Sequence, residues 1–105
     1  MKERLPDEGH AAPRLILFIV GDEANSKRAR ANLSAFRAEA PEADYELEVV
    51  DVLEDYKRAL EYDVVVAPAL VVLSENESTT ILGDLSDREA LRAALRRGEV
   101  STRER

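Results

Sequence analysis

The sequence has no cysteine, and its 105 residues include a single histidine, His10. The absence of thiols excludes disulfides, thiolate metal sites, iron–sulfur clusters and thiol-based redox catalysis. One histidine close to the N-terminus cannot form a histidine cluster for a metal, and it leaves the rest of the chain without an imidazole base. The sequence therefore predicts no metal, no cofactor and no enzymatic activity.

Long hydrophobic runs and an excess of basic residues are also absent. The strongly apolar stretches, residues 15–20 and 64–73, span about six to ten residues, whereas a membrane-spanning helix needs about 20. No apolar core of a secretory signal follows the charged N-terminus. With 22 acidic and 15 basic residues the net charge is −7, which disfavours binding to a phosphate backbone. We expect a cytoplasmic protein that binds neither membranes nor nucleic acids.

The length fits one domain with a single core. Residues 1–13 have mixed charges, two prolines and no apolar period, which predicts a flexible N-terminal arm. Residues 98–105 predict a flexible C-terminal tail in the same way. The folded domain is then expected over residues 14–97.

The first half of this domain alternates between strand and helix patterns. Residues 15–20 are apolar on both faces, as in a central strand of a parallel sheet. A helix is expected next, capped by Asn25 or Ser26 and ending before Pro41. Residues 45–49 alternate between apolar and charged, which predicts a strand that has one solvated face or lies at a sheet edge.

A short helix is expected over residues 54–62, with Lys57 and Arg58 on its solvated side. Its packing residues would be Tyr56, Ala59 and Leu60. Pro68 cannot donate to a sheet ladder, so the next strand begins after it, at residues 69–73, and forms a hairpin with residues 79–82.

The last pattern is a helix that begins with a capping box, Ser86 to Glu89, and ends at Gly98. Its buried face would be formed by Leu91, Ala94 and Leu95. We interpret the acidic residues here as turn and cap groups rather than metal ligands. The order β-α-β-α-β-β-α predicts an α/β thioredoxin-like fold, a mixed four-stranded sheet with helices on both faces.

Four segments carry a family pattern: residues 20–28 (VGDEANSKR), 49–53 (VVDVL), 66–70 (VAPAL) and 81–89 (ILGDLSDRE). They resemble the KaiB family of the cyanobacterial circadian clock and its bacterial relatives, and the resemblance covers about residues 14–97. The most specific part consists of Gly83, Asp84, Leu85, Ser86, Asp87, Arg88 and Glu89.

The resemblance implies a protein–protein interaction domain that binds and regulates a KaiC-type RecA-like ATPase. It also implies a cis peptide bond before Pro68, as is usual at this step of a thioredoxin-like fold. From the way such folds present their loops, we expect the partner-binding residues to be Asp22, Asn25, Lys57, Asp63, Ala67 and Pro68.

The sequence departs from the clock members of the family in its last helix and last strand. Ala94 and Arg96 stand where those members have glycine and an acid, and Thr79 and Thr80 where basic residues are common. Alanine and a C-terminal arginine favour a helix by a total of about 1–2 kcal/mol. We therefore expect Ala94 and Arg96 to hold the chain in the thioredoxin-like fold, whereas KaiB proteins also adopt a second fold.

Two other interpretations stay open. The chain could be a sensor domain like that of the clock kinase SasA, or a self-assembling thioredoxin-like adaptor with a different partner. An enzyme on the same fold is disfavoured, because no cysteine and no histidine fall within residues 14–97.

Overall fold

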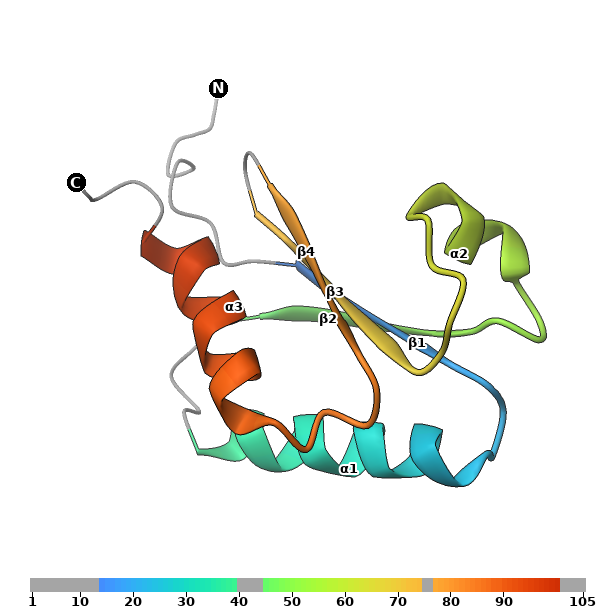
Figure 1. The fold of residues 1–105 in the computed structure, drawn as a ribbon, viewed down its shortest axis with the longest axis horizontal. Coiled ribbons are helices and arrows are strands. Elements are labelled where there is room, and N and C mark those ends of the chain that lie inside the picture. Colours follow the sequence, from blue (N-terminus) through green and yellow to red (C-terminus); the bar gives the residue numbers. More distant parts are fainter. Residues whose placement is uncertain (1–13, 40–44, 75–76, 101–105) are drawn as a thin grey trace.

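The computed structural model describes residues 14–39, 45–74 and 77–100 (Figure 1). The elements follow in the order β-α-β-α-β-β-α, as predicted. They are β1 (Arg14–Ile19), α1 (Ala24–Ala38), β2 (Glu46–Asp51), α2 (Tyr56–Glu61), β3 (Ala69–Leu73), β4 (Ser78–Leu82) and α3 (Arg88–Val100). The flexible arm expected over residues 1–13 lies outside the described residues, as do residues 101–105 of the expected tail.

The four strands form one mixed sheet in the order β2-β1-β3-β4. β1 runs parallel to β2 and antiparallel to β3, and β3 pairs with β4 as an antiparallel hairpin. At the centre of the sheet, Leu17 lies beside Val49 on one side and Leu70 on the other. The prediction of a central first strand is confirmed. Of the two placements left open for the second strand, the structure has the edge position.

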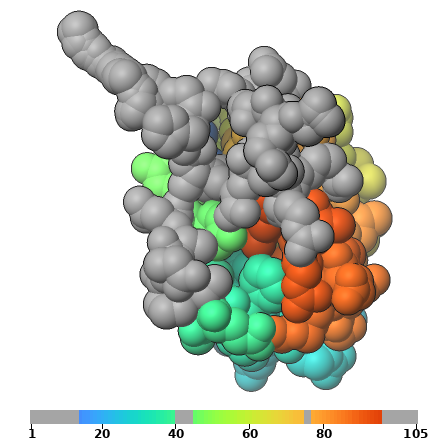
Figure 2. Space-filling model, turned by 90° about the vertical axis from the view of Figure 1, so that its left-hand side faces the viewer, coloured from blue at the N-terminus to red at the C-terminus, as the bar shows by residue number. Residues whose placement is uncertain are grey.

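Two helices cover one face of the sheet. Figures 1 and 2 show α1 and α3 side by side, and buried residues of both helices share one cluster with residues of the strands. The core beneath them includes Leu17, Leu33 and Leu91, which are each at most 1% exposed. This layer confirms the predicted buried face of α3, including Ala94.

The opposite face has α2 alone, a helix of six residues. Its core contains Phe18, Val71 and Ala59, and the Phe18 and Tyr62 rings lie 6.1 Å apart between centroids. The prediction that Tyr56 and Leu60 pack inward is wrong, because they are 62% and 59% exposed. The helix is rotated so that its Arg58–Ala59 side faces the sheet, where Arg58 bonds to a β2 carboxylate. The expected solvation of Arg58 is therefore also wrong.

The cap of α1 differs from the expected one. Glu23 is the N-cap, with φ −58° and ψ 145°, and its carboxylate accepts a hydrogen bond from the Ser26 N–H at 3.1 Å. Asn25 and Ser26 are already inside the helix. Ser26 is fully buried, and its Oγ accepts a hydrogen bond from the Val20 N–H at 2.9 Å. Its hydroxyl therefore joins the end of β1 to the helix instead of capping it.

The start and end of α3 also differ from the sequence pattern. Asp87 caps the helix, since its carboxylate accepts a hydrogen bond from the Ala90 N–H at 3.1 Å, so the capping box from Ser86 is wrong. The helix continues past Gly98 to Val100. Ala94 and Arg96 both lie within it, and the side chain of Arg96 is outside the described part. Their influence on the choice between two folds stays a prediction.

Candidate protein-interaction surface

Several connections meet at the end of the sheet where β1 and β2 finish. One carboxylate oxygen joins two of them: Oδ1 of Asp51 accepts hydrogen bonds from the N–H of Gly21 at 3.1 Å and of Leu53 at 3.0 Å. Gly21 has a φ of +48°, and a Cβ there would lie 3.4 Å from the Leu53 side chain. The β1–α1 turn and the β2–α2 connection are thus held against each other (Figure 1).

Pro68 lies at this same end, directly before β3. Its peptide bond with Ala67 is cis, which confirms the expectation. The proline ring is buried, Ala67 is half-buried, and the Pro68 carbonyl accepts a hydrogen bond from the Gly83 N–H at 2.9 Å. Pro68 thus ties the start of β3 to the end of β4, and Ala67 has the more accessible side chain of the two.

The other residues expected to bind a partner are all exposed. Asp22 lies in the β1–α1 turn, Lys57 lies on α2, and Asp63 follows α2 with a positive φ of 58°. The Asn25 side-chain oxygen accepts a hydrogen bond from Arg28. The fold therefore brings the Asp22 turn and the Ala67–Pro68 step to one end of the sheet, with α2 beside them. Their role in binding stays a prediction.

The 83–89 segment forms a structured turn into α3. Leu85 is 2% exposed and has a φ of +63°, a strained conformation for a residue with a side chain. Asp84 stabilises this turn by accepting hydrogen bonds from Ser86, which lower the pKa of its carboxyl group, and it also contacts Arg28. Among the described residues, no group of three or more histidines, cysteines or acids could hold a metal. No helix of this described part is long and apolar enough to cross a membrane.

The segment between β2 and β3 exposes apolar side chains that the sequence patterns did not reveal. It carries five of the seven large hydrophobic side chains exposed in the described part of the chain. We call these five the α2 apolar surface: Leu53, Tyr56, Leu60, Val65 and Val66. Tyr56 and Leu60 are four residues apart and so share one side of α2, but the sequence does not show whether that side faces the sheet or the solvent.

An ion-pair network holds α2 against the edge strand β2. The guanidinium of Arg58 donates two hydrogen bonds to the Glu48 carboxylate, at 2.6 and 3.0 Å, and lies 5.9 Å from the centroid of the Tyr62 ring. These bonds lower the pKa of Glu48 and raise that of Arg58. A paired, planar contact of this kind fixes orientation better than a single ion pair does. Arg58 is thus the residue that turns Tyr56 and Leu60 outward.

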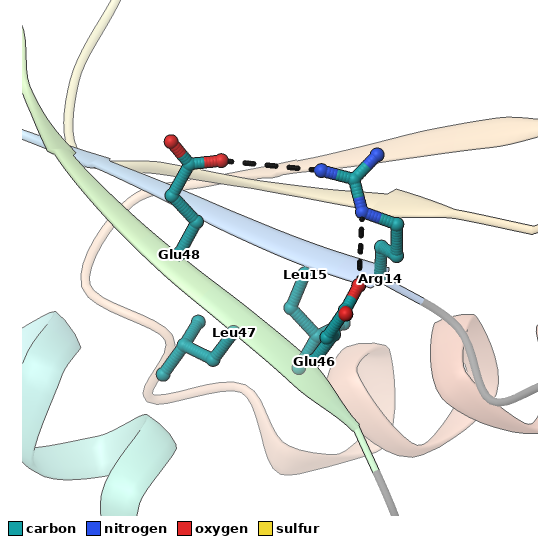
Figure 3. A pocket seen from close by; sticks show the side chains of 5 residues that line it. All are labelled: Arg14, Leu15, Glu46, Leu47 and Glu48. Carbon is teal, nitrogen blue, oxygen red and sulfur yellow. Dashed lines mark ion pairs between the residues drawn. The ribbon is translucent and has the colours of Figure 1, made fainter.

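Glu48 has a second cationic neighbour in a shallow pocket on the same edge. Figure 3 shows Arg14 between Glu46 and Glu48. Its guanidinium nitrogens lie 3.3 Å from a carboxylate oxygen of Glu46 and 4.0 Å from one of Glu48, and Leu47 points to the face of the sheet that carries α1 and α3. The charged side chains that line this pocket are paired with one another. We therefore regard the pocket as part of the ion-pair network that holds α2 against β2, and we assign no ligand to it.

The Glu48–Arg58 pair makes the stability of the protein depend on pH. A carboxylate with a lowered pKa stabilises the fold above the pKa of its unfolded form, and that contribution is lost as the pH falls through its folded pKa. We expect Glu48→Gln to be less stable than the parent near neutral pH, and the difference in their free energies of unfolding to become smaller below about pH 4. Urea unfolding of both proteins across this pH range measures the difference. Glu77→Gln, an exposed carboxylate on the β3–β4 turn, is the control, and a pH-independent gap for Glu48→Gln would contradict the assignment.

Comparison with known proteins agrees with the fold and the motifs. The model of the KaiB domain matches residues 16–97. The chain belongs to the KaiB family. It is 35% identical over 75 residues to the circadian clock protein KaiB3 of Synechocystis, covering 71% of this chain and 74% of that one. It is 36% identical to the circadian clock oscillator protein KaiB of Microcystis aeruginosa, covering 71% and 72%.

Solved structures share the fold of this KaiB-family chain at lower identity. The N-terminal domain of Synechococcus elongatus SasA is similar with a TM-score of 0.69 and 22% identity, over 90% of this chain and 88% of that domain. Fasciola hepatica thioredoxin has a TM-score of 0.68 and 20% identity, over 88% and 86%. The predicted thioredoxin-like fold is confirmed.

Proposed function

We propose that this protein is a non-enzymatic, cytoplasmic interaction domain that docks on a KaiC-type RecA-like ATPase and regulates it. The docking face consists of the α2 apolar surface together with the adjoining Asp22 turn and Ala67–Pro68 step. Family membership supports the class of partner. The chemistry of the face supports binding through contact alone, since it offers neither a thiol nor an imidazole.

One observation supports this proposal most strongly: exposed apolar side chains are concentrated in residues 53–66. Val65 is 86% exposed and Leu53 is 71% exposed, beside a helix that itself exposes an aromatic ring. Clusters of this kind, rimmed by polar groups, are typical of protein interaction sites. Aromatic residues such as tyrosine are enriched among the few residues that supply most of the energy of such interfaces, at a centre from which water is excluded.

The rim of this face indicates the charge of its partner. Exposed acidic residues are interspersed with the apolar side chains along residues 53–66, and Lys57 is an exposed cation on α2. They are Glu54, Asp55, Glu61 and Asp63. Complementary potentials at an interface steer association and exclude wrong partners. We expect the contacting face of the ATPase to have an apolar centre with basic residues around it, and binding to weaken as salt is raised.

Size-exclusion chromatography with light scattering tests the proposal. The full chain is run alone, and then mixed with the KaiC-type ATPase of the same cell in ATP and in ADP. We expect a complex whose abundance depends on the nucleotide. A chain that never joins the ATPase in either nucleotide overturns the proposed partner while leaving the fold unaffected.

A further inference from the structure

The outer edge of β4 is the starting point for a further inference. At one end of the β3–β4 hairpin, the Gly83 N–H donates to the Pro68 carbonyl, and at the other the Ser74 N–H donates to the Glu77 carbonyl, both at 2.9 Å. Antiparallel strands direct the backbone groups of alternate residues to the same neighbour. The residues of β4 that bond toward β3 are therefore Thr79 and Ile81, between Glu77 and Gly83.

The backbone groups of the remaining β4 residues point away from the sheet. These residues are Ser78, Thr80 and Leu82. β4 is the last strand of the sheet, so no strand of the described chain pairs with their N–H and C=O groups. All three side chains are exposed, and Leu82 is 61% exposed. By register, Thr80 lies opposite Val71 and Leu82 opposite Ala69, which places them on the face of the sheet that carries α2.

The two edges of the sheet differ in charge. Natural edge strands are commonly protected from pairing by charged side chains. The β2 edge follows this rule, with Glu46 and Glu48 and with Arg14 beside them. β4 has no charged residue, and its sequence is STTIL. A second strand can therefore approach β4 without meeting like charge, whereas two β2 edges would bring carboxylates together.

We propose that β4 pairs with β4 of a second copy of this chain, antiparallel and centred on Thr80. This register matches the outward groups: Thr80 pairs with its own counterpart, and Ser78 pairs with Leu82 of the other copy. It also places Glu77 opposite Gly83 of the other copy. The next residue, Asp84, is already paired with Arg28 of its own chain at 3.4 Å, which offsets its charge beside Glu77. The result is a continuous sheet across both copies, with both α2 helices on one face and the α1 and α3 layers on the other.

The expected dimer is weak and depends on ionic strength. A strand pair of this length buries less surface than a standard stable interface. The two copies also repel each other, since each has a net charge of −7. Salt screens this repulsion, so we expect the dimer to strengthen as salt is raised. Docking on the ATPase is expected to weaken under the same change, which distinguishes the two interactions.

Charge complementation at Thr80 tests the register. Sedimentation equilibrium of the full chain over a range of concentrations measures the dimer constant, and circular dichroism checks the fold. Thr80→Lys and Thr80→Asp place like charges face to face, and we expect each alone to dimerise about fivefold more weakly than the parent. Mixing the two variants should restore the dimer, because lysine then faces aspartate.

Ser78→Lys and Ser78→Asp are the matched control. Ser78 is exposed on the same strand but faces Leu82 in this register, so a mixture of its two variants should not gain dimer over either one alone. Recovery with the Thr80 pair and none with the Ser78 pair supports the register. A parent chain that stays monomeric at every concentration and salt, or Thr80 variants that dimerise as the parent does, overturns the proposal.

Discussion

Replacing Leu91 with alanine is expected to lower the free energy of unfolding by about 2–5 kcal/mol. Leu91 is fully buried where α3 packs on the sheet, in the same cluster as Leu17 and Leu33. The substitution removes apolar contacts and leaves a cavity that the surrounding strands cannot close. The free energy of unfolding of a domain of this size is about 5–15 kcal/mol in total, so the substitution removes a large part of it. Urea unfolding monitored by circular dichroism measures the change.

Leu60→Ala is the matched control for that experiment. It makes the same chemical change in a helix, but at a side chain that is 59% exposed. We expect its effect on unfolding to stay within about 0.5 kcal/mol, as for surface substitutions in general. Equal losses for Leu91→Ala and Leu60→Ala would contradict the packing of α3 and the orientation of α2 described above.

Because Leu60 is 59% exposed and is expected to contribute little to stability, its substitution can report on binding. We expect the double variant Tyr56→Ala/Leu60→Ala to bind the KaiC-type ATPase at least about 30-fold more weakly than the parent, the equivalent of losing one interface hot spot. Both side chains project from the same side of α2 and form the centre of the proposed docking face. Isothermal titration calorimetry in the nucleotide that supports the complex measures the affinity.

Val49→Ala provides the comparison for the binding experiment. Val49 is also an exposed apolar residue, at 41%, but it follows Leu47 in alternation and so lies on the sheet face opposite α2. Its truncation should leave the affinity unchanged. If the Val49 variant loses binding and the Tyr56/Leu60 variant retains it, the docking face is on the other side of the molecule.

The arrangement of the strands could be predicted from the sequence because strand patterns are local. The apolar run ending at Val20 can be buried only between two strands, and the alternation around Leu47 requires one solvated face. Pro68 marked the start of β3, since it cannot donate to a ladder. For these elements, tertiary packing and local pattern agree.

The helix caps and the orientation of α2 could not be predicted, because they depend on contacts that are distant in sequence or compete locally. Ser26 is a good capping residue in isolation, but its hydroxyl is taken up by the Val20 N–H, and Glu23 caps in its place. The Ser86 hydroxyl is similarly taken up by a hydrogen bond to the Asp84 carboxylate, and Asp87 caps α3 in its place. The rotation of α2 depends on the Glu48–Arg58 pair, which joins residues of two different elements and has no periodic signal.

The Asp51 carboxylate has a consequence for the thermodynamics of recognition. By accepting hydrogen bonds from both Gly21 and Leu53, it fixes the chain at the point where the α2 apolar surface begins. Arg58 fixes the same segment at its helix. A binding face that is ordered before its partner arrives loses little conformational entropy on association, so more of its contact energy appears as affinity. Such a face also suits rigid-body docking, in which the domain keeps one shape before and after the complex forms.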